Sequence, residues 1–190
     1  MNEWGTLIGA ILLLFGQEFL KWCKERRKLK DAPKEMLKTL TKSAAIQDCL
    51  DELRHTVKCD RVHIIQYSNG NTDLTGDSFK NYSIRYESVN PIYAPVYMQY
   101  QNVPVGQYSE LLKTIQQKGY TYIGYHDDSN IGRLHRTYGI HSSYKFRLGN
   151  HIVNGSLSLA WHNEDVKLTE KQLGVVKDYV VKIHELMNLK

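Results

Sequence analysis

The stretch Ser142–Trp161, SSYKFRLGNHIVNGSLSLAW, decides the fold of this chain. It contains two β-rich segments, Ser143–Leu148 and Val153–Trp161, separated by a short run that includes Gly149 and Asn150. Glycine and asparagine favour the tight turns that join antiparallel strands, so we predict a β-hairpin here. This hairpin is the clearest local signal in the sequence, and the neighbouring segments are interpreted around it.

Other segments show signals of the same kinds. Asn81–Val89 alternates Tyr82, Ile84 and Tyr86 with polar residues, as a half-buried antiparallel strand does. Because the predicted strands are adjacent in pairs and the helices lie at the ends, we expect an α+β domain with a central antiparallel sheet flanked by helices. Further strands are predicted at 61–67 and 120–125, and helices at 31–57, 108–119, 128–139 and 168–187.

The composition is that of a globular protein with one domain and an appendage. Of the 190 residues, 42% are hydrophobic and 24% charged, and no segment combines low hydrophobicity with high charge as disordered regions do. The three cysteines, Cys23, Cys49 and Cys59, show no CxxC spacing. We therefore expect a reducing compartment, and neither a disulfide framework nor a zinc site.

An apolar helix is predicted at the N-terminus, before the globular domain. From Trp4 to Trp22 a helix spans roughly 28 Å, close to the hydrocarbon thickness of a bilayer. We predict a membrane anchor at 1–22, although Gln17 and Glu18 interrupt its apolar run. The alternative is a helix buried in an oligomer or a particle. The predicted anchor residues are Trp4, Leu7, Leu13, Phe15 and Trp22.

Basic residues follow this apolar run. Residues 1–30 hold six Lys and Arg against three Glu, so most of the formal charge of +5 lies there. This distribution favours an anionic lipid surface as the partner of residues 4–30 and argues against nucleic acid. The positive-inside rule predicts a single-pass protein of the inner or plasma membrane with its main domain in the cytoplasm. The predicted lipid contacts are Lys21, Lys24, Arg26 and Arg27.

The C-terminal third resembles a GAF domain, a small-molecule sensor fold related to PAS. The resemblance rests on YGIHSSYKFRL at 138–148, NGSLSL at 154–159 and LTE at 168–170, which leads into an amphipathic helix. It implies a GAF-like domain at 46–190, preceded by a basic juxtamembrane segment and connecting helix at 23–45. A membrane segment followed by a single GAF-like domain also resembles small bacterial and phage-encoded proteins.

The sequence departs from parts of the GAF pattern. Arg147 stands where a proline is frequent, and the Asn-Lys-x-Phe-Asp-Glu motif of cyclic-nucleotide-binding members is missing. No cysteine lies in the region that corresponds to a bilin pocket. The resemblance therefore implies neither cyclic-nucleotide binding nor a covalently attached chromophore, and no cofactor is expected.

Tyrosines supply the candidates for a ligand pocket. Twelve of the thirteen lie between 67 and 144, and tyrosine offers an apolar ring with a polar tip to a small molecule. Core packing on strands is the alternative role for most of them. The candidates nearest a pocket are Tyr67, Tyr86, Tyr125 and Tyr144, with Asn69 at its mouth.

No sequence motif indicates catalysis. His126, Asp127 and Asp128 are adjacent, but neighbours on one loop seldom converge on a metal, and Asp128 has a role as a helix cap. There is no G-x-S-x-G elbow and no phosphate-binding glycine loop. We expect no catalytic residue and no metal. The alternative, an enzyme acting on a small molecule, would gain support from a cavity that holds two convergent titratable groups, for example His126 or Asp127 with His141.

These observations favour a membrane-anchored GAF-like sensor or protein-interaction domain without catalytic activity. Its expected partners are an unidentified small molecule, a protein that receives the signal, and a second copy bound through the first and last helices. The alternative is a structural protein, such as a subunit of a phage particle, that uses the GAF-like fold as a scaffold.

Overall fold

The computed structural model describes residues 3–68, 81–149 and 155–188, without the side chains of 3–16, 23, 27–30 and 107. The chain forms two units, Met1–Ser43 and Ala44–Lys190. Helix α1 (Glu3–Val57) supplies the first unit and continues into the second. The sequence predicted a helix beginning at Asp31-Ala32-Pro33, but Pro33 lies inside α1, where it lacks the N–H that the helical hydrogen bond needs.

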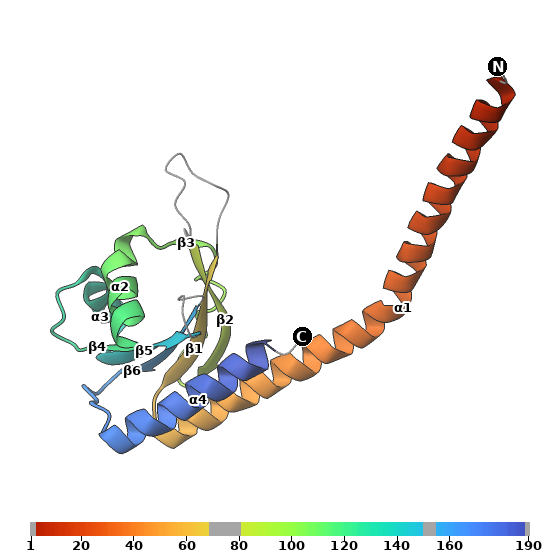
Figure 1. Cartoon of the computed structure of the whole chain (residues 1–190). Coiled ribbons are helices and arrows are strands. Elements are labelled where there is room, and N and C mark those ends of the chain that lie inside the picture. Colours follow the sequence, from red (N-terminus) through yellow and green to blue (C-terminus); the bar gives the residue numbers. More distant parts are fainter. Residues whose placement is uncertain (1–2, 69–80, 150–154, 189–190) are drawn as a thin grey trace. The chain divides into compact units, whose positions relative to one another are not determined.

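The second unit is built on one six-stranded antiparallel sheet. Its strands lie in the order β3-β2-β1-β6-β5-β4 (Figure 1). The predicted α+β domain, with a central antiparallel sheet and flanking helices, is confirmed. The elements after α1 are β1 (Arg61–Ser68), β2 (Asn81–Val89), β3 (Val103–Pro104), the 3-10 helix η1 (Gly106–Tyr108), α2 (Ser109–Lys118), β4 (Tyr120–Ile123), α3 (Asn130–Thr137), β5 (Ser142–Leu148), β6 (Gly155–Trp161) and α4 (Glu170–Asn188).

The predicted hairpin supplies β6, one of the two central strands of the sheet, and its neighbour β5. Strands β5 and β6 pair from Ser142 opposite Trp161 to Leu148 opposite Gly155, and β6 pairs on its other side with β1. Because successive side chains in a strand point to opposite faces, Tyr144 and Phe146 share one face while Lys145 lies on the other. The two faces of the hairpin therefore have different chemistry, and each is covered by a different layer.

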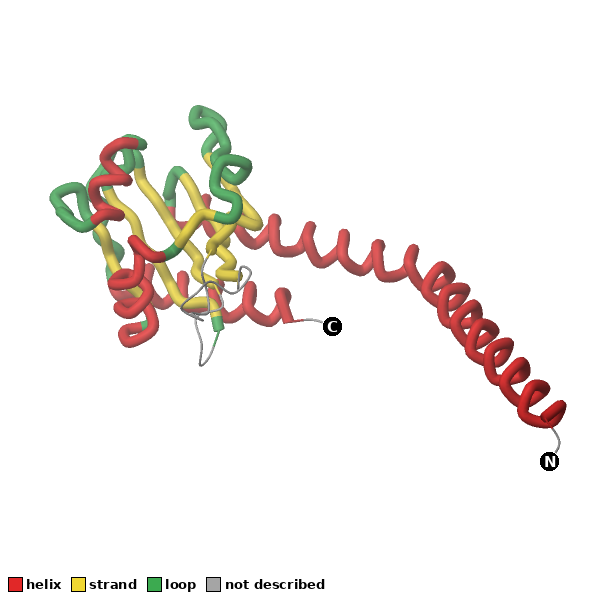
Figure 2. Tube along the Cα trace, turned by 90° about the horizontal axis from the view of Figure 1, so that it is seen from above, coloured by secondary structure: helices red, strands yellow, loops and turns green. Residues whose placement is uncertain are grey.

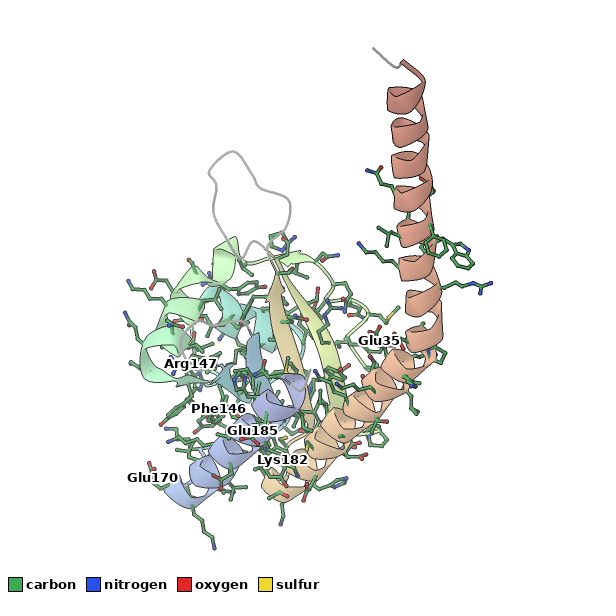
Figure 3. All side chains as sticks on the ribbon, turned by 45° about the vertical axis from the view of Figure 1, so that its right-hand side comes forward. Glu35, Phe146, Arg147, Glu170, Lys182 and Glu185 are labelled. Atoms are coloured by element: carbon green, nitrogen blue, oxygen red, sulfur yellow. The ribbon has the colours of Figure 1, made fainter. Side chains whose placement is uncertain are left out.

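One face packs against α4 and the last turns of α1 (Figure 2). Leu50 and Leu53 of α1 and Val176 of α4 are fully buried there with Leu157 and Leu159 of β6. Burial of each such side chain contributes about 2 kcal/mol, so this face holds the main core. At the surface of this layer Lys182 of α4 forms an exposed ion pair with Glu52 of α1 at 3.5 Å (Figure 3).

The other face is covered by α2, α3 and residues 90–102, which we call the strap (Figure 1). As predicted, α2 ends at Gly119, which adopts a left-handed conformation with φ 79°. The cap of α3 is Ser129, whose hydroxyl accepts from the Gly132 N–H at 3.2 Å. The prediction of Asp128 as the cap is wrong, because its carboxylate lies in solvent, 3.7 Å from Arg136.

The predicted membrane span is wrong. Among the residues that the structure describes, no helix has a stretch long and apolar enough to cross a bilayer. At the end of the predicted span, the Trp22 side chain is half exposed, and the Arg26 guanidinium lies over its ring, 4.4 Å from the ring centre. The predicted localisation, a single-pass protein of the inner or plasma membrane, is therefore wrong. The predicted orientation, with the main domain in the cytoplasm, depended on that span and is no longer supported. Of the predicted lipid contacts, Lys21, Lys24 and Arg26 are exposed. The side chains of Trp4, Leu7, Leu13, Phe15 and Arg27 lie outside the described residues.

Candidate functional site

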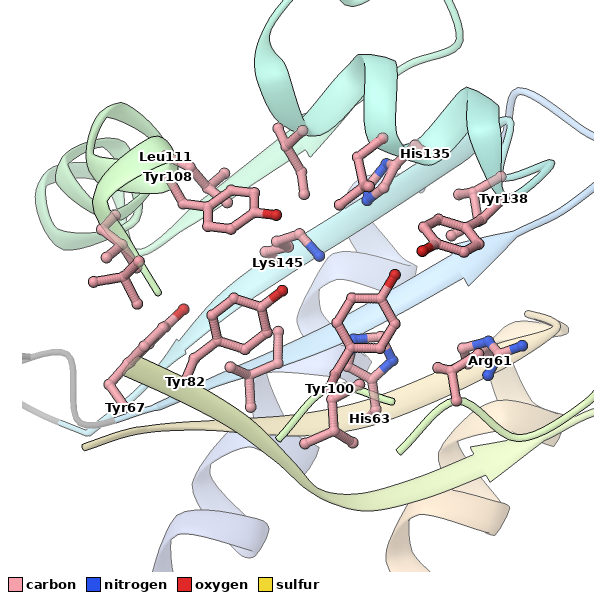
Figure 4. Close-up of a pocket in the computed structure, with 18 of the residues that line it drawn as sticks. Arg61, His63, Tyr67, Tyr82, Tyr100, Tyr108, Leu111, His135, Tyr138 and Lys145 are labelled. Carbon is pink, nitrogen blue, oxygen red and sulfur yellow. The ribbon is translucent and has the colours of Figure 1, made fainter. Parts of the chain in front are cut away.

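A cavity of about 130 Å³ lies between the sheet and the layer formed by α2, α3 and the strap (Figure 4). Its wall is mainly apolar, and polar groups enter it from β1, β5, α3 and the residue after β6. The lining residues are Arg61, His63, Ile65, Tyr67, Tyr82, Ile84, Val96, Tyr100, Val105, Tyr108, Leu111, Leu112, Ile131, Leu134, His135, Tyr138, Ile140, Lys145 and His162.

The sequence of β6 explains why space remains on this face. By strand alternation Ser156, Ser158 and Ala160 lie on the cavity side, while leucines and Trp161 lie on the helix side. These three small side chains leave space above β6, and longer side chains from the neighbouring strands extend over them. The Tyr67 hydroxyl reaches the Ser156 hydroxyl at 3.0 Å, and the Lys145 ammonium donates to the Ser158 hydroxyl at 2.9 Å.

Lys145 is the most unusual of the lining residues. It is only 4% exposed, and burial lowers the pKa of its ammonium to about 8. Its one hydrogen bond is to Ser158, and no carboxylate among the described residues pairs with it. Lysine is rarely buried unless it is paired, because an uncompensated ammonium in an apolar site costs free energy.

Three buried histidines surround the same space. Burial and the nearby Lys145 and Arg61 charges lower the pKa of His63 well below its ordinary value, and burial lowers that of His135 to about 2. Burial also lowers the pKa of His162. All three rings are therefore neutral at pH 7. His63 Nδ1 and His162 Nε2 are buried and have no hydrogen-bond partner among the described residues, which is rare for buried polar atoms.

A buried ion pair holds the strap over the cavity. Glu87 of β2 pairs with Arg61 of β1, and both side chains are nearly inaccessible to solvent. The same carboxylate accepts from the N–H groups of Val96 and Tyr97 at 2.9 and 3.0 Å, and Arg61 donates to the Ala94 carbonyl at 3.0 Å. These hydrogen bonds fix the strap by its backbone, so its position depends on this ion pair.

Tyrosine rings form much of the remaining wall. Tyr82 meets Tyr108 edge to face with ring centres 5.6 Å apart, and Tyr100 meets Tyr138 in the same way at 6.0 Å. Burial raises the pKa of Tyr67 to about 12, so its hydroxyl stays protonated. The wall thus offers apolar surface edged by hydroxyl groups, a surface suited to a small organic ligand.

The structure brings one predicted pocket residue to the cavity and places three elsewhere. Tyr67 lines the cavity. Tyr144 lies on the helix face, where its hydroxyl accepts from the Leu168 N–H at 3.1 Å, and Tyr86 pairs with Ile64 and packs on the same face. Tyr125 is 38% exposed outside the cavity lining, and Asn69 lies outside the described residues.

The lining of this cavity does not include His126, Asp127, Asp128 or His141. The Asp127 carboxylate accepts from the Ser129 N–H at 2.8 Å and its carbonyl accepts from Arg136 at 2.7 Å, so it shapes the loop before α3. No group of three potential metal ligands occurs among the described residues. The two described cysteines, Cys49 and Cys59, belong to the core of the helix face, so neither reaches the cavity.

Comparison with known proteins shows the fold. No protein-family model and no curated protein matches the sequence. Solved structures do match, among them the phycocyanobilin-bound GAF domain of a cyanobacterial phytochrome. It is 15% identical with a TM-score of 0.63, and the match covers 84% of this chain and 91% of that one.

Two further structures give the same result. The GAF domain/HD domain protein of Geobacter sulfurreducens matches at 11% identity and a TM-score of 0.58, over 76% of this chain and 90% of that one. A GAF domain of Synechocystis in its photoproduct state matches at 14% identity and a TM-score of 0.56, over 75% and 90%. The predicted GAF-like fold is therefore confirmed. The resemblance to phage-encoded proteins with a membrane segment finds no support in these comparisons.

Proposed function

We propose that this chain is a small-molecule sensor of GAF-like fold, without catalytic activity, whose ligand occupies the cavity between the sheet and the strap. The observation that carries this proposal is a set of buried polar groups in an otherwise apolar cavity: the Lys145 ammonium, which pairs with no carboxylate among the described residues, and the unpartnered His63 Nδ1 and His162 Nε2. Such groups are costly in an empty site, and a ligand that hydrogen-bonds to them removes the cost.

The size of the cavity limits the ligand. About 130 Å³ is close to the engineered cavities of roughly 150 Å³ that take up benzene, and well below the roughly 300–1,000 Å³ of sites for drug-sized molecules. One similar domain binds phycocyanobilin. In this chain no thiol lines the cavity among the described residues, and we propose a much smaller ligand that is not covalently attached.

A sensor needs a part that differs between the free and bound states. The strap and α3 both contribute to the cavity wall, and the strap is held by the Glu87 carboxylate. A ligand shifts the position of these elements only if it binds one arrangement more tightly than the other. We propose that the signal passes to a protein partner or a second copy through the layer of α1 and α4.

A second candidate function is a scaffold in a larger assembly. The observation in its favour is the first unit, where Phe19, Leu20, Met36 and Leu37 are all at least 60% exposed on α1. Exposed apolar side chains gathered on one element mark surfaces that bind other proteins. In this reading α1 packs against other subunits and the cavity has no ligand.

Native mass spectrometry of the full chain distinguishes the two candidates. The protein is equilibrated with a bacterial metabolite extract, and its native mass is compared with its denatured mass. We expect a non-covalent adduct that is lost in Ser158→Leu, which fills the cavity floor, and kept in Ser109→Leu, an exposed serine on α2. Equal native and denatured masses would contradict the sensor proposal and favour the scaffold.

A further inference from the structure

The geometry of the cavity points to the chemical class of its ligand: a small carboxylate whose anionic head binds the Lys145 ammonium and whose compact apolar body lies under α3 and the strap. This inference rests on the proposed function, because it names the ligand of the same cavity. Lys145 projects from β5 into the space bounded by these elements (Figure 4).

The charges around the cavity leave one positive group, the Lys145 ammonium, without a carboxylate partner among the described residues. Arg61 and Glu87 neutralise each other, and the second oxygen of Glu87 is occupied by two N–H groups of the strap. The Lys145 ammonium has three N–H donors, of which one bonds to Ser158. Two donors and one full charge remain for a ligand, and a carboxylate supplies the matching charge and acceptors.

The neutral histidines add to this preference. His63 lies two strands from Lys145 in the same cross-sheet row, with Ser158 between them. A neutral imidazole donates from whichever nitrogen carries its proton, so the unpartnered nitrogens of His63 and His162 can complete the hydrogen bonds of a polar head group. A metal cation in this space would be repelled by Lys145, so the three histidines do not favour a metal.

The apolar wall and the volume select the rest of the ligand. Ile131, Leu134 and Val96 line the cavity from the side of α3 and the strap. About 130 Å³ accommodates a body of benzene size. A nucleotide is too large for this cavity, and a multiply charged phosphate would need more cationic partners than Lys145 supplies.

Benzoate and its neutral isostere benzamide test the inference on the full-length protein. Isothermal titration calorimetry measures both affinities for the wild type and for Lys145→Met, which keeps an unbranched apolar stem and removes the ammonium. Lys113→Met, at an exposed position on α2, is the matched control. We expect the wild type and the control to prefer benzoate by at least about tenfold, and Lys145→Met to lose this preference while still binding benzamide.

The other outcomes separate this inference from the proposed function. Equal affinities of the wild type for benzoate and benzamide would show that the cavity takes ligands but does not recognise an anion, which overturns the inference alone. A preference for benzoate that persists in Lys145→Met would assign anion binding to another group and overturn it too. If neither probe binds at millimolar concentration the carboxylate inference fails, and the adduct in the native mass spectrum then decides the proposed function independently.

Discussion

Replacing Lys145 with methionine measures the effect of the buried ammonium on the stability of the unliganded protein. The folded-state pKa of this lysine is about 8, against 10.5 for an ordinary lysine. Each unit of pKa difference corresponds to about 1.4 kcal/mol, so the charged form destabilises the folded state by about 3 kcal/mol at neutral pH. Methionine removes this cost, and it also removes the hydrogen bond to Ser158. The loss of that hydrogen bond offsets about 1 kcal/mol of the stability gained by removing the charge.

The dependence on pH isolates the contribution of the charge. Because the folded-state pKa of Lys145 is lowered, the unfolded chain binds more protons between about pH 8 and 10.5, and stability rises with pH in that window. The cost is fully present below pH 8. Between pH 7 and 9 the wild type should gain about 1 kcal/mol relative to Lys145→Met. His63, His135 and His162 remain neutral over this range because burial lowers their pKa values.

Urea unfolding of the wild type, Lys145→Met and Lys113→Met at pH 7 and pH 9 measures this difference. We expect the free energy of unfolding of Lys113→Met to follow the wild type, since its side chain is exposed. The gap between the wild type and Lys145→Met should narrow at pH 9. A gap that is the same at both pH values would refute the reasoning, because it would mean that Lys145 titrates alike in the folded and unfolded chains.

Three further predictions test the elements around the cavity, and two of them include a matched control variant. Glu87→Gln leaves its buried guanidinium partner uncompensated and should lower the free energy of unfolding in urea by about 3–5 kcal/mol. Glu52→Gln breaks an exposed pair and should lower it by at most about 1 kcal/mol; equal losses would contradict the structural role of the buried ion pair. With its folded-state pKa lowered to about 2, His135 stabilises the fold above pH 6.5 and loses that contribution below it, about 2 kcal/mol between pH 7 and 5. His135→Gln should make the fall in the free energy of unfolding between pH 7 and 5 less steep. The same fall in the wild type and the variant would contradict the lowered pKa of His135. A Cβ on Gly132 would lie 2.1 Å from a backbone carbonyl oxygen, so Gly132→Ala should lower the melting temperature. Gly174 lies in open space on α4, so Gly174→Ala should stabilise the protein by about 1 kcal/mol. A higher melting temperature for Gly132→Ala than for Gly174→Ala would contradict the steric clash expected at Gly132.

Much of the second unit could be predicted because its signals are local. The bounds predicted for β2 are those observed, and Gly119 ends α2 in the left-handed conformation that glycine adopts most readily. The β5–β6 hairpin likewise follows from strand-forming residues on both sides of a turn signal. The helix start predicted at Asp31 failed because a local capping signal competes with a helix that is already formed on both sides of Pro33.

The cavity could not be predicted in the same way. Strand alternation divides the side chains between the two faces of the sheet, but it does not indicate which face borders the cavity. Strand β5 is buried on both faces, so Tyr144 and Lys145 give no indication of which one meets the cavity. Tyrosine suits a ligand pocket and lysine is seldom buried, so residue type favours Tyr144 as the pocket residue, whereas the structure places Lys145 there. The row of small residues on β6, Ser156, Ser158 and Ala160, was the available signal for the face with space above it.

The positions of Glu87 and Lys145 in the sheet explain why Glu87 does not neutralise Lys145. The anion that we propose for Lys145 is therefore an external ligand. Their strands are separated by β1 and β6, and three strand spacings place the two backbones about 14 Å apart. Glu87 is engaged by Arg61 and the strap, so it cannot also neutralise Lys145. At this separation the effects of two substitutions are usually additive. Glu87→Gln should therefore loosen the strap and weaken the binding of benzamide, but it should keep the preference for benzoate, because the uncompensated Arg61 guanidinium also lines the cavity. Lys145→Met should act on benzoate alone. If Glu87→Gln also abolished the preference for benzoate, the buried Arg61–Glu87 ion pair and the anion site would form one charge network, and the assignment of anion recognition to Lys145 alone would fail.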